Sequence, residues 1–194
     1  MNLGILNETV IIIDTDFLNE RISHNLTFYK ELYPDKNFEK INLAELLYDF
    51  ALNARVEEEG RNVDIIFAYT LSNSILVHCT PSNLTYDISS DGVQMETDIG
   101  KFLIRSFWGD IGETCIEHFC NILRMADNSS RVARIIIIAD NDFLNDQLEY
   151  MEYKKEKILL LIKKYHHTEI NVDIKYVNID YIVADSLGLN KNEI

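Results

Sequence analysis

Two short acidic motifs, each at the end of an apolar run, contain the residues of this sequence that are best suited to chemistry. The run Val10–Ile13 ends in the segment DTDFLNE, which starts at Asp14, and the run IIIIA ends in DNDFLND, which starts at Asp140. Carboxylates one residue apart can bind Mg²⁺ or Mn²⁺ while water and a substrate phosphate complete the coordination. The motifs therefore predict a divalent-cation site that contains four carboxylates, those of Asp14, Asp16, Asp140 and Asp142.

The apolar runs before the motifs must position these carboxylates. Both runs are rich in Ile and Val without alternation, which is typical of strands buried on both faces of a parallel sheet. We predict that residues 9–14 and 134–139 are neighbouring parallel strands, so that Asp14 and Asp140 lie close together at the carboxyl edge, beside a crevice. Asp is also a frequent N-cap residue, and Asp16 and Asp142 have helix capping as an alternative role.

Helices are predicted to alternate with strands along the rest of the chain. Apolar residues at helical spacing predict helices over 17–33, 43–54, 113–125 and 143–165, with a short turn over 82–88 capped by Thr80. Strand-forming runs lie at 63–69, 75–79, 101–108 and 172–179, and the first two are expected to form a hairpin. This order predicts a single three-layer α/β domain over residues 1–194, with a mostly parallel central sheet, helices on both faces and a variable, hairpin-containing insertion at about 71–110.

The composition limits the classes of partner. The chain has 32 Asp and Glu against 18 Lys and Arg, and its net charge of -14 disfavours general coating of nucleic acids or anionic membranes. Three cysteines without a C-x-x-C pair are typical of a reducing compartment, and no apolar run approaches the ~20 residues of a membrane span. We therefore expect a cytoplasmic protein that does not enter a membrane.

A polar stripe on the helix predicted over 113–125 could reach the same crevice. Glu113, Glu117 and Asn121 follow one another at four-residue spacing, which places them on one helix face. The stripe is either part of the site or a solvated face. His118 points about a quarter turn away from Glu117, so we do not expect it to share the site.

Residues 10–19 and 121–146 resemble the PIN/NYN-type nuclease fold. The first strand ends in Asp14, and ADNDF at 139–143 is similar to the GDSDF-like signature that ends the family's fourth strand. The segment NILRMA, which starts at Asn121, resembles the LRLA-like helix before that strand. The resemblance implies a PIN/NYN-like fold and a hydrolase that uses Mg²⁺ or Mn²⁺ to cleave phosphodiesters in single-stranded RNA.

The chain departs from this family at the metal-binding residue that the helix before the fourth strand supplies. Asn121 stands where an acidic residue is expected, and Glu117, one turn earlier on the same face, is expected to replace it. Phe17 also stands where the family usually has an Asn. The resemblance thus implies catalytic roles for Asp14, Asp140 and Glu117. It implies metal ligands drawn from Asp14, Asp16, Asp140, Asp142, Glu117 and Asn121.

A second interpretation is a non-catalytic PIN/NYN-like interaction or adaptor protein, which binds a protein partner or forms a homodimer. Asn121 and the acidic charge favour it. One basic and aromatic concentration, which is either a surface for single-stranded RNA or a solvated helix face, comprises Tyr150, Tyr153, Lys154, Lys155 and Lys157.

A third interpretation is a haloacid-dehalogenase-type phosphatase. The DTD motif and Thr70, which follows a later strand, resemble that family. The resemblance implies that Asp14 is the nucleophile and Asp16 the general acid.

Overall fold

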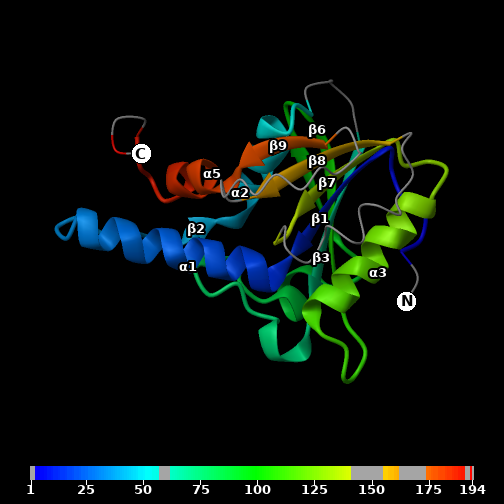
Figure 1. The fold of residues 1–194 in the computed structure, drawn as a ribbon, viewed down its shortest axis with the longest axis horizontal. Helices are drawn as coiled ribbons and strands as arrows, with labels where there is room; N and C mark the ends of the chain where they lie inside the picture. Colours follow the sequence, from blue (N-terminus) through cyan, green and yellow to red (C-terminus); the bar gives the residue numbers. More distant parts are fainter. Residues whose placement is uncertain (1–2, 57–61, 141–154, 162–173, 191–192, 194) are drawn as a thin grey trace.

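A mostly parallel sheet forms the centre of the computed structural model, which describes residues 3–56, 62–140, 155–161, 174–190 and 193 (Figure 1). Among these residues, seven strands pair in the order β5-β6-β3-β1-β7-β8-β9. Every pair is parallel except β5 with β6. The strands are β1 (Thr9–Asp14), β3 (Asn62–Tyr69), β5 (Val93–Thr97), β6 (Gly100–Trp108), β7 (Arg134–Ile138), β8 (Glu156–Leu161) and β9 (Ile174–Asn178).

Helices cover both faces of the sheet. The helix α3 (Cys115–Asn128) packs on one face, and three helices lie on the other: α1 (Thr15–Leu32), α2 (Leu43–Asn53) and α5 (Ile179–Ser186) (Figure 1). The short strands β2 (Ile41–Asn42) and β4 (Cys79–Thr80) pair with each other outside the main sheet. The expected α/β architecture with a mostly parallel sheet is confirmed.

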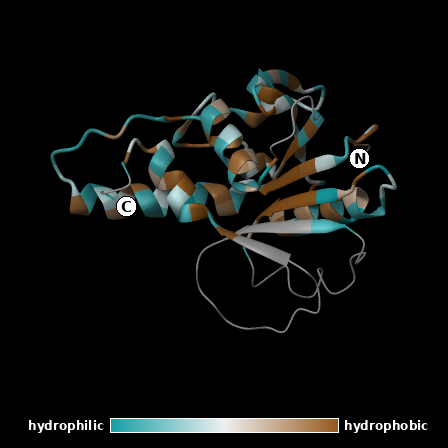
Figure 2. Ribbon diagram, turned by 90° about the horizontal axis from the view of Figure 1, so that it is seen from above, coloured by the Kyte–Doolittle hydropathy of each residue, from teal (hydrophilic) through white to brown (hydrophobic). Residues whose placement is uncertain are grey.

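Strand β1 occupies the middle of the sheet, and its apolar run Val10–Ile13 suits a strand that is buried on both faces. All six are buried. Alternate side chains face opposite layers, so Ile11 and Ile13 join the core under α1, α2 and α5, while Val10 and Ile12 join the core under α3. Figure 2 shows hydrophobic residues concentrated along the strands between the helix layers. The predicted pairing of β1 with β7 is confirmed, with Ile13 opposite Ile138.

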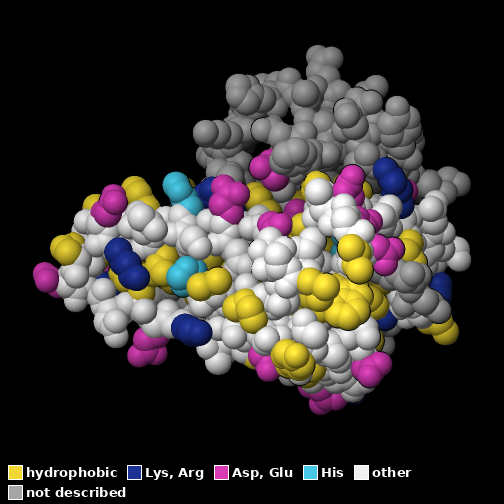
Figure 3. Space-filling model, turned by 90° about the horizontal axis from the view of Figure 1, so that it is seen from below, with side chains coloured by type: hydrophobic (Ala, Val, Ile, Leu, Met, Phe, Trp, Pro, Cys, Tyr) yellow, Lys and Arg dark blue, Asp and Glu magenta, His cyan; other side chains and the backbone are white. Residues whose placement is uncertain are grey.

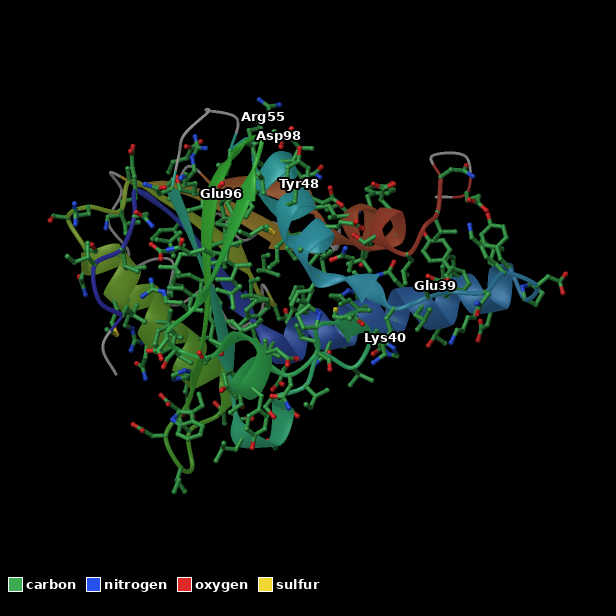
Figure 4. All side chains as sticks on the ribbon, turned by 180° about the vertical axis from the view of Figure 1, so that it is seen from behind. Glu39, Lys40, Tyr48, Arg55, Glu96 and Asp98 are labelled. Carbon is green, nitrogen blue, oxygen red and sulfur yellow. The ribbon has the colours of Figure 1, made fainter. Side chains whose placement is uncertain are left out.

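The predicted hairpin over 63–79 is wrong. Residues 75–79 do not pair with β3; the amide of Asn19 donates to the Ile75 carbonyl (2.9 Å) and its carbonyl oxygen accepts from the Val77 N–H (3.2 Å). These contacts supply hydrogen bonds that a strand partner would otherwise provide. The hairpin is instead β5–β6, and the turn of this hairpin is tied to α2 by the hydroxyl of Tyr48, which donates to Asp98 (3.4 Å; Figure 4).

The predicted long helix over 143–165 is also wrong where it overlaps β8. Residues 156–161 form a strand between β7 and β9. A continuous apolar run such as ILLL fits a buried parallel strand as well as a helix, and periodicity cannot separate the two. The predicted last strand corresponds to β9, and α5 after it was not predicted. The short turn is η2 (Leu84–Ile88), capped by Asn83 rather than Thr80. None of the helices within the described ranges is long and apolar enough to cross a membrane.

Candidate functional site

The carboxyl edge between β1 and β7 is the natural place for a site in this topology. The parallel strands extend from β1 through β3 to β6 in one direction, and from β7 through β8 to β9 in the other. In open α/β sheets, ligands bind outside the carboxyl ends of the strands at such a switch point. Asp14 ends β1, and Asp140 follows the end of β7 by two residues. Both predicted motifs therefore begin at this edge.

Asp14 is held in place as the N-cap of α1. Its Oδ1 accepts hydrogen bonds from the backbone N–H groups of Asp16 (2.9 Å) and Phe17 (3.3 Å). The residue is only 5% exposed. Burial raises the pKa of the Asp14 carboxyl, the hydrogen bonds partly offset this effect, and the charge of Asp16 adds a smaller increase.

The thiol of Cys115, the first residue of α3, contacts Asp14 directly. Its Sγ lies 3.3 Å from Asp14 Oδ1 and 3.3 Å from the carbonyl oxygen of Ala68. Burial, with the nearby charges of Asp14 and Asp16, raises the pKa of the Cys115 thiol well above its ordinary value. The thiol therefore stays protonated at neutral pH and donates a hydrogen bond.

Asp14, Asp16 and Cys115 form one compact group, which we call the edge cluster. Each residue offers a ligand atom within 4.8 Å of the others, and no other such group occurs among the residues that the structure describes. Two of its members are hard carboxylate ligands of the kind that Mg²⁺ and Mn²⁺ prefer, whereas the third is a soft sulfur. Sequence reasoning used the cysteines only as an indication of a reducing compartment and missed Cys115. A usable signal was the Thr114-x-x-Glu117 spacing, which places the helix start at Cys115.

Asp140 lies at the same edge but outside the edge cluster. The pairing of Ile13 with Ile138 places Asp14 level with Ala139, so that Asp140 stands one residue further along. Ala139 is buried beneath α3, and Asp140 is half-buried. Asp142, the remaining acidic residue of the predicted site, lies outside the described residues.

Glu117 is engaged at the start of its own helix. Its Oε2 accepts from the backbone N–H and the hydroxyl of Thr114, both at 2.8 Å, and Thr114 accepts in return from the Glu117 N–H. These bonds form a capping box and lower the pKa of Glu117. Glu117 is exposed and contributes no atom to the edge cluster. The carboxylate expected to replace the missing helix ligand therefore serves as part of a cap.

Asn121 and His118 converge on Glu113 instead. Asn121 Nδ2 donates to Glu113 Oε1 (2.5 Å), and His118 Nδ1 lies 3.2 Å from Glu113 Oε2. His118 Nε2 lies 3.1 Å from the carbonyl of Phe107. Glu113 precedes α3 by two residues, so the helical spacing assumed for the polar stripe does not apply to it. These three residues border a separate cavity of about 370 Å³.

Lys155, which belongs to the predicted basic and aromatic group, does not lie on a solvated helix face. This residue is buried, and its Nζ donates to the backbone carbonyls of Ala126, Asp127 and Ser129 at the end of α3. Lys155 thus acts on the helix terminus. Tyr150, Tyr153 and Lys154 lie outside the described residues, and for Lys157 only the backbone in β8 is described.

A cavity of about 530 Å³ opens beside the edge cluster. The loop after β3 and the loop between β6 and α3 line it, together with Asp16 and Cys115. The described lining contains the carboxylates of Asp16, Asp110 and Glu113 and neither Lys nor Arg. Figure 3, which views this edge of the molecule, shows hydrophobic side chains gathered on its surface. The site is therefore acidic and partly apolar.

Comparison with known proteins assigns the chain to a family. Residues 4–194 match the model described as Family of unknown function (DUF6621). The chain belongs to this family. No curated protein and no solved structure matches it.

Proposed function

We propose that this DUF6621 protein is a non-catalytic PIN/NYN-like domain that acts as an interaction or adaptor protein through the carboxyl edge of its sheet. The observation that carries the proposal is the position of Cys115. In the PIN/NYN nucleases that the sequence resembles, an acidic residue from the helix before the fourth strand completes the metal site. Here the α3 side chain that meets Asp14 is a protonated thiol.

The other residues of α3 support the same conclusion. Glu117 is held by Thr114 in a capping box, and Asn121 is hydrogen-bonded to Glu113. Neither contributes to the edge cluster. A cation that activates water for attack on a phosphodiester needs several hard oxygen ligands held in fixed geometry. The edge cluster offers two carboxylates, one of which is already engaged as a helix cap.

The electrostatics of the edge also disfavour RNA. The described lining of the cavity carries acidic side chains and no basic ones, and the whole chain has a net charge of -14. Affinity for nucleic acids depends on Lys and Arg that neutralise phosphates. A cytoplasmic location fits the proposal, because the hydrogen bond from Cys115 to Asp14 requires a reduced thiol.

The proposal is tested by assaying the full chain on single-stranded RNA with millimolar Mn²⁺. We expect the wild type to be inert and its melting temperature to be unmoved by Mn²⁺. Cys115→Asp should restore a third carboxylate, so that Mn²⁺ raises its melting temperature by linkage. Cys115→Ser is the matched control, since a hydroxyl can keep the hydrogen bond to Asp14 without adding charge. Metal-dependent cleavage by the wild type that Asp14→Asn abolishes would overturn the proposal.

The second candidate is a Mg²⁺- or Mn²⁺-dependent ribonuclease. It is favoured by the adjacency of the Asp14 and Asp16 carboxylates and by the position of Asp140 after the neighbouring strand. In this case Asp14, Asp16 and Asp140 would hold the cation. The phosphatase ranks third, because Phe17 and Leu18 stand where that family has Gly-Thr after the second Asp.

A further inference from the structure

Five large apolar side chains are exposed on two loops at the carboxyl edge of the sheet and at the end of β6. We call them the edge patch: Leu71, Ile75, Val77, Trp108 and Ile111. Ile111 is fully exposed, and Leu71 and Trp108 are 60% and 56% exposed. The first loop follows β3 and the second follows β6, so both leave the sheet at its carboxyl ends. Figure 3 shows hydrophobic side chains gathered on this face. Several large apolar side chains exposed on one face of an acidic protein are typical of an interaction site.

The two loops flank the cavity beside the edge cluster. Leu71 and Ile111 stand among its lining residues, and Asp16, Asp110 and Glu113 supply carboxylates between the loops. A ligand in this cavity would therefore meet both apolar side chains and negative charge. Trp108, the last residue of β6, lines the two neighbouring cavities.

Hydrogen bonds hold both loops in place. Asn19 on α1 bonds to the backbone of Ile75 and Val77. The Gly109 N–H donates to the carbonyl of Tyr69 (2.9 Å), which joins the two loops at their bases. Glu113 Oε2 accepts from the Asp110 N–H (3.0 Å). Side chains presented by fixed loops lose less entropy when a partner binds, which favours docking.

We propose that the edge patch and its cavity bind a segment of a partner protein that presents an apolar side chain next to a lysine or arginine. This inference rests on the proposed function and names the chemistry of its partner. The apolar side chain would cover Leu71 and Ile111, and the cation would face the carboxylates of Asp16 and Asp110. Single-stranded RNA lacks a complementary charge. A second copy of the chain carries the same charge of -14.

The test is a selection of random twelve-residue peptides displayed on phage against the full wild-type chain, with the double variant Leu71→Ser/Ile111→Ser as the counter-target. Enriched peptides should carry an apolar or aromatic residue beside Lys or Arg. In fluorescence anisotropy they should bind the double variant about tenfold more weakly than the wild type. Ile5→Ser/Phe28→Ser, which removes two exposed apolar side chains elsewhere, is the matched control and should bind like the wild type. Both variants should melt like the wild type.

Several outcomes would overturn the inference. These are no enrichment over the counter-target, enrichment of acidic peptides, or equal binding to both double variants. A wild type that sediments as a dimer, while the Leu71→Ser/Ile111→Ser variant is monomeric, would assign the patch to self-association instead. Binding of a single-stranded RNA that is lost in the same variant would assign it to RNA. If the peptide selection fails and the wild type is inert in the ribonuclease assay, the proposed partner is wrong but the proposed non-catalytic function is not contradicted. RNA cleavage by the wild type would contradict the proposed function itself.

Discussion

Asp14 combines two roles that affect stability in opposite directions. As the N-cap of α1 it satisfies two backbone N–H groups, which stabilises the helix. As a buried carboxylate it raises the free energy of the folded state when it is ionised. Burial therefore raises its pKa above the ordinary 3.8.

We expect Asp14→Asn to raise the melting temperature at pH 7. The folded state binds the Asp14 proton more tightly than the unfolded state. Its contribution to stability is therefore present at low pH and is lost as the pH rises from 3.8 through the raised pKa. Asn caps helices about as well as Asp but carries no charge, so it avoids this loss. In a domain of this size each kcal/mol gained corresponds to about 2–4 °C.

Melting temperatures measured between pH 4 and pH 8 check this prediction. The wild type should lose stability relative to Asp14→Asn as the pH rises, and the two curves should approach each other at the acidic end. Asp16→Asn removes the same charge from the more exposed neighbour and serves as the control. If Asp14→Asn is less stable than the wild type at pH 7, the ionised Asp14 carboxylate stabilises the fold, as it would with a bound cation.

Lys155 determines how the helix α3 ends. The last carbonyls of a helix have no N–H partner within the helix. The buried ammonium of Lys155 donates hydrogen bonds to carbonyls around the α3 C-terminus. The contact also joins α3 to the start of β8. It therefore fixes the helix that delivers Cys115 to the edge cluster at its other end.

We expect Lys155→Met to lower the free energy of unfolding by about 2–3 kcal/mol, because the hydrogen bonds from a buried charged group to three backbone carbonyls are lost. Chemical denaturation measures this loss. Lys40→Met, at an exposed position, is the matched control and should change stability by less than about 0.5 kcal/mol. Equal stability of the two variants would show that water replaces the ammonium at the helix end.

A buried ion pair joins three distant segments of the whole molecule. Asp64 on β3 is fully buried and accepts from Arg105 on β6 (2.6 Å) and from the Asn7 N–H (2.6 Å). Arg105 also donates to the carbonyl of Leu3. The pair thereby holds the segment before β1 against the α3 face of the sheet.

Breaking this pair should destabilise the protein strongly. Asp64→Asn leaves the buried guanidinium without a counter-charge, and we expect a loss of about 3–5 kcal/mol in the free energy of unfolding. Glu96→Gln breaks the exposed pair of Glu96 with Lys101 (2.9 Å) and is the control, with an expected loss of at most about 1 kcal/mol. The double variant Asp64→Leu/Arg105→Met should lose less than Asp64→Asn alone. A larger loss in the double variant would contradict this account.

The sequence by itself determined the elements whose pattern has one interpretation. Helical spacing of apolar residues identified α1, α2 and α3, and the two Ile-rich runs identified β1 and β7 as neighbours. The motif after β1 also placed Asp14 and Asp16 at the carboxyl edge, because a strand end fixes where the next residues must lie. These conclusions depend on local pattern and on the general geometry of parallel sheets.

Only the tertiary structure decided the features that depend on contacts between distant segments. The run before Leu161 fits a helix or a buried strand equally well, and pairing with β7 made it β8. Glu117 and Lys155 have side chains that could serve a site, but a capping partner and a helix end engage them. Cys115 meets Asp14 from 101 residues away, because the packing of α3 against β1 and β3 brings the helix start to the strand end. No spacing in the sequence encodes that distance, since it is set by how two layers pack.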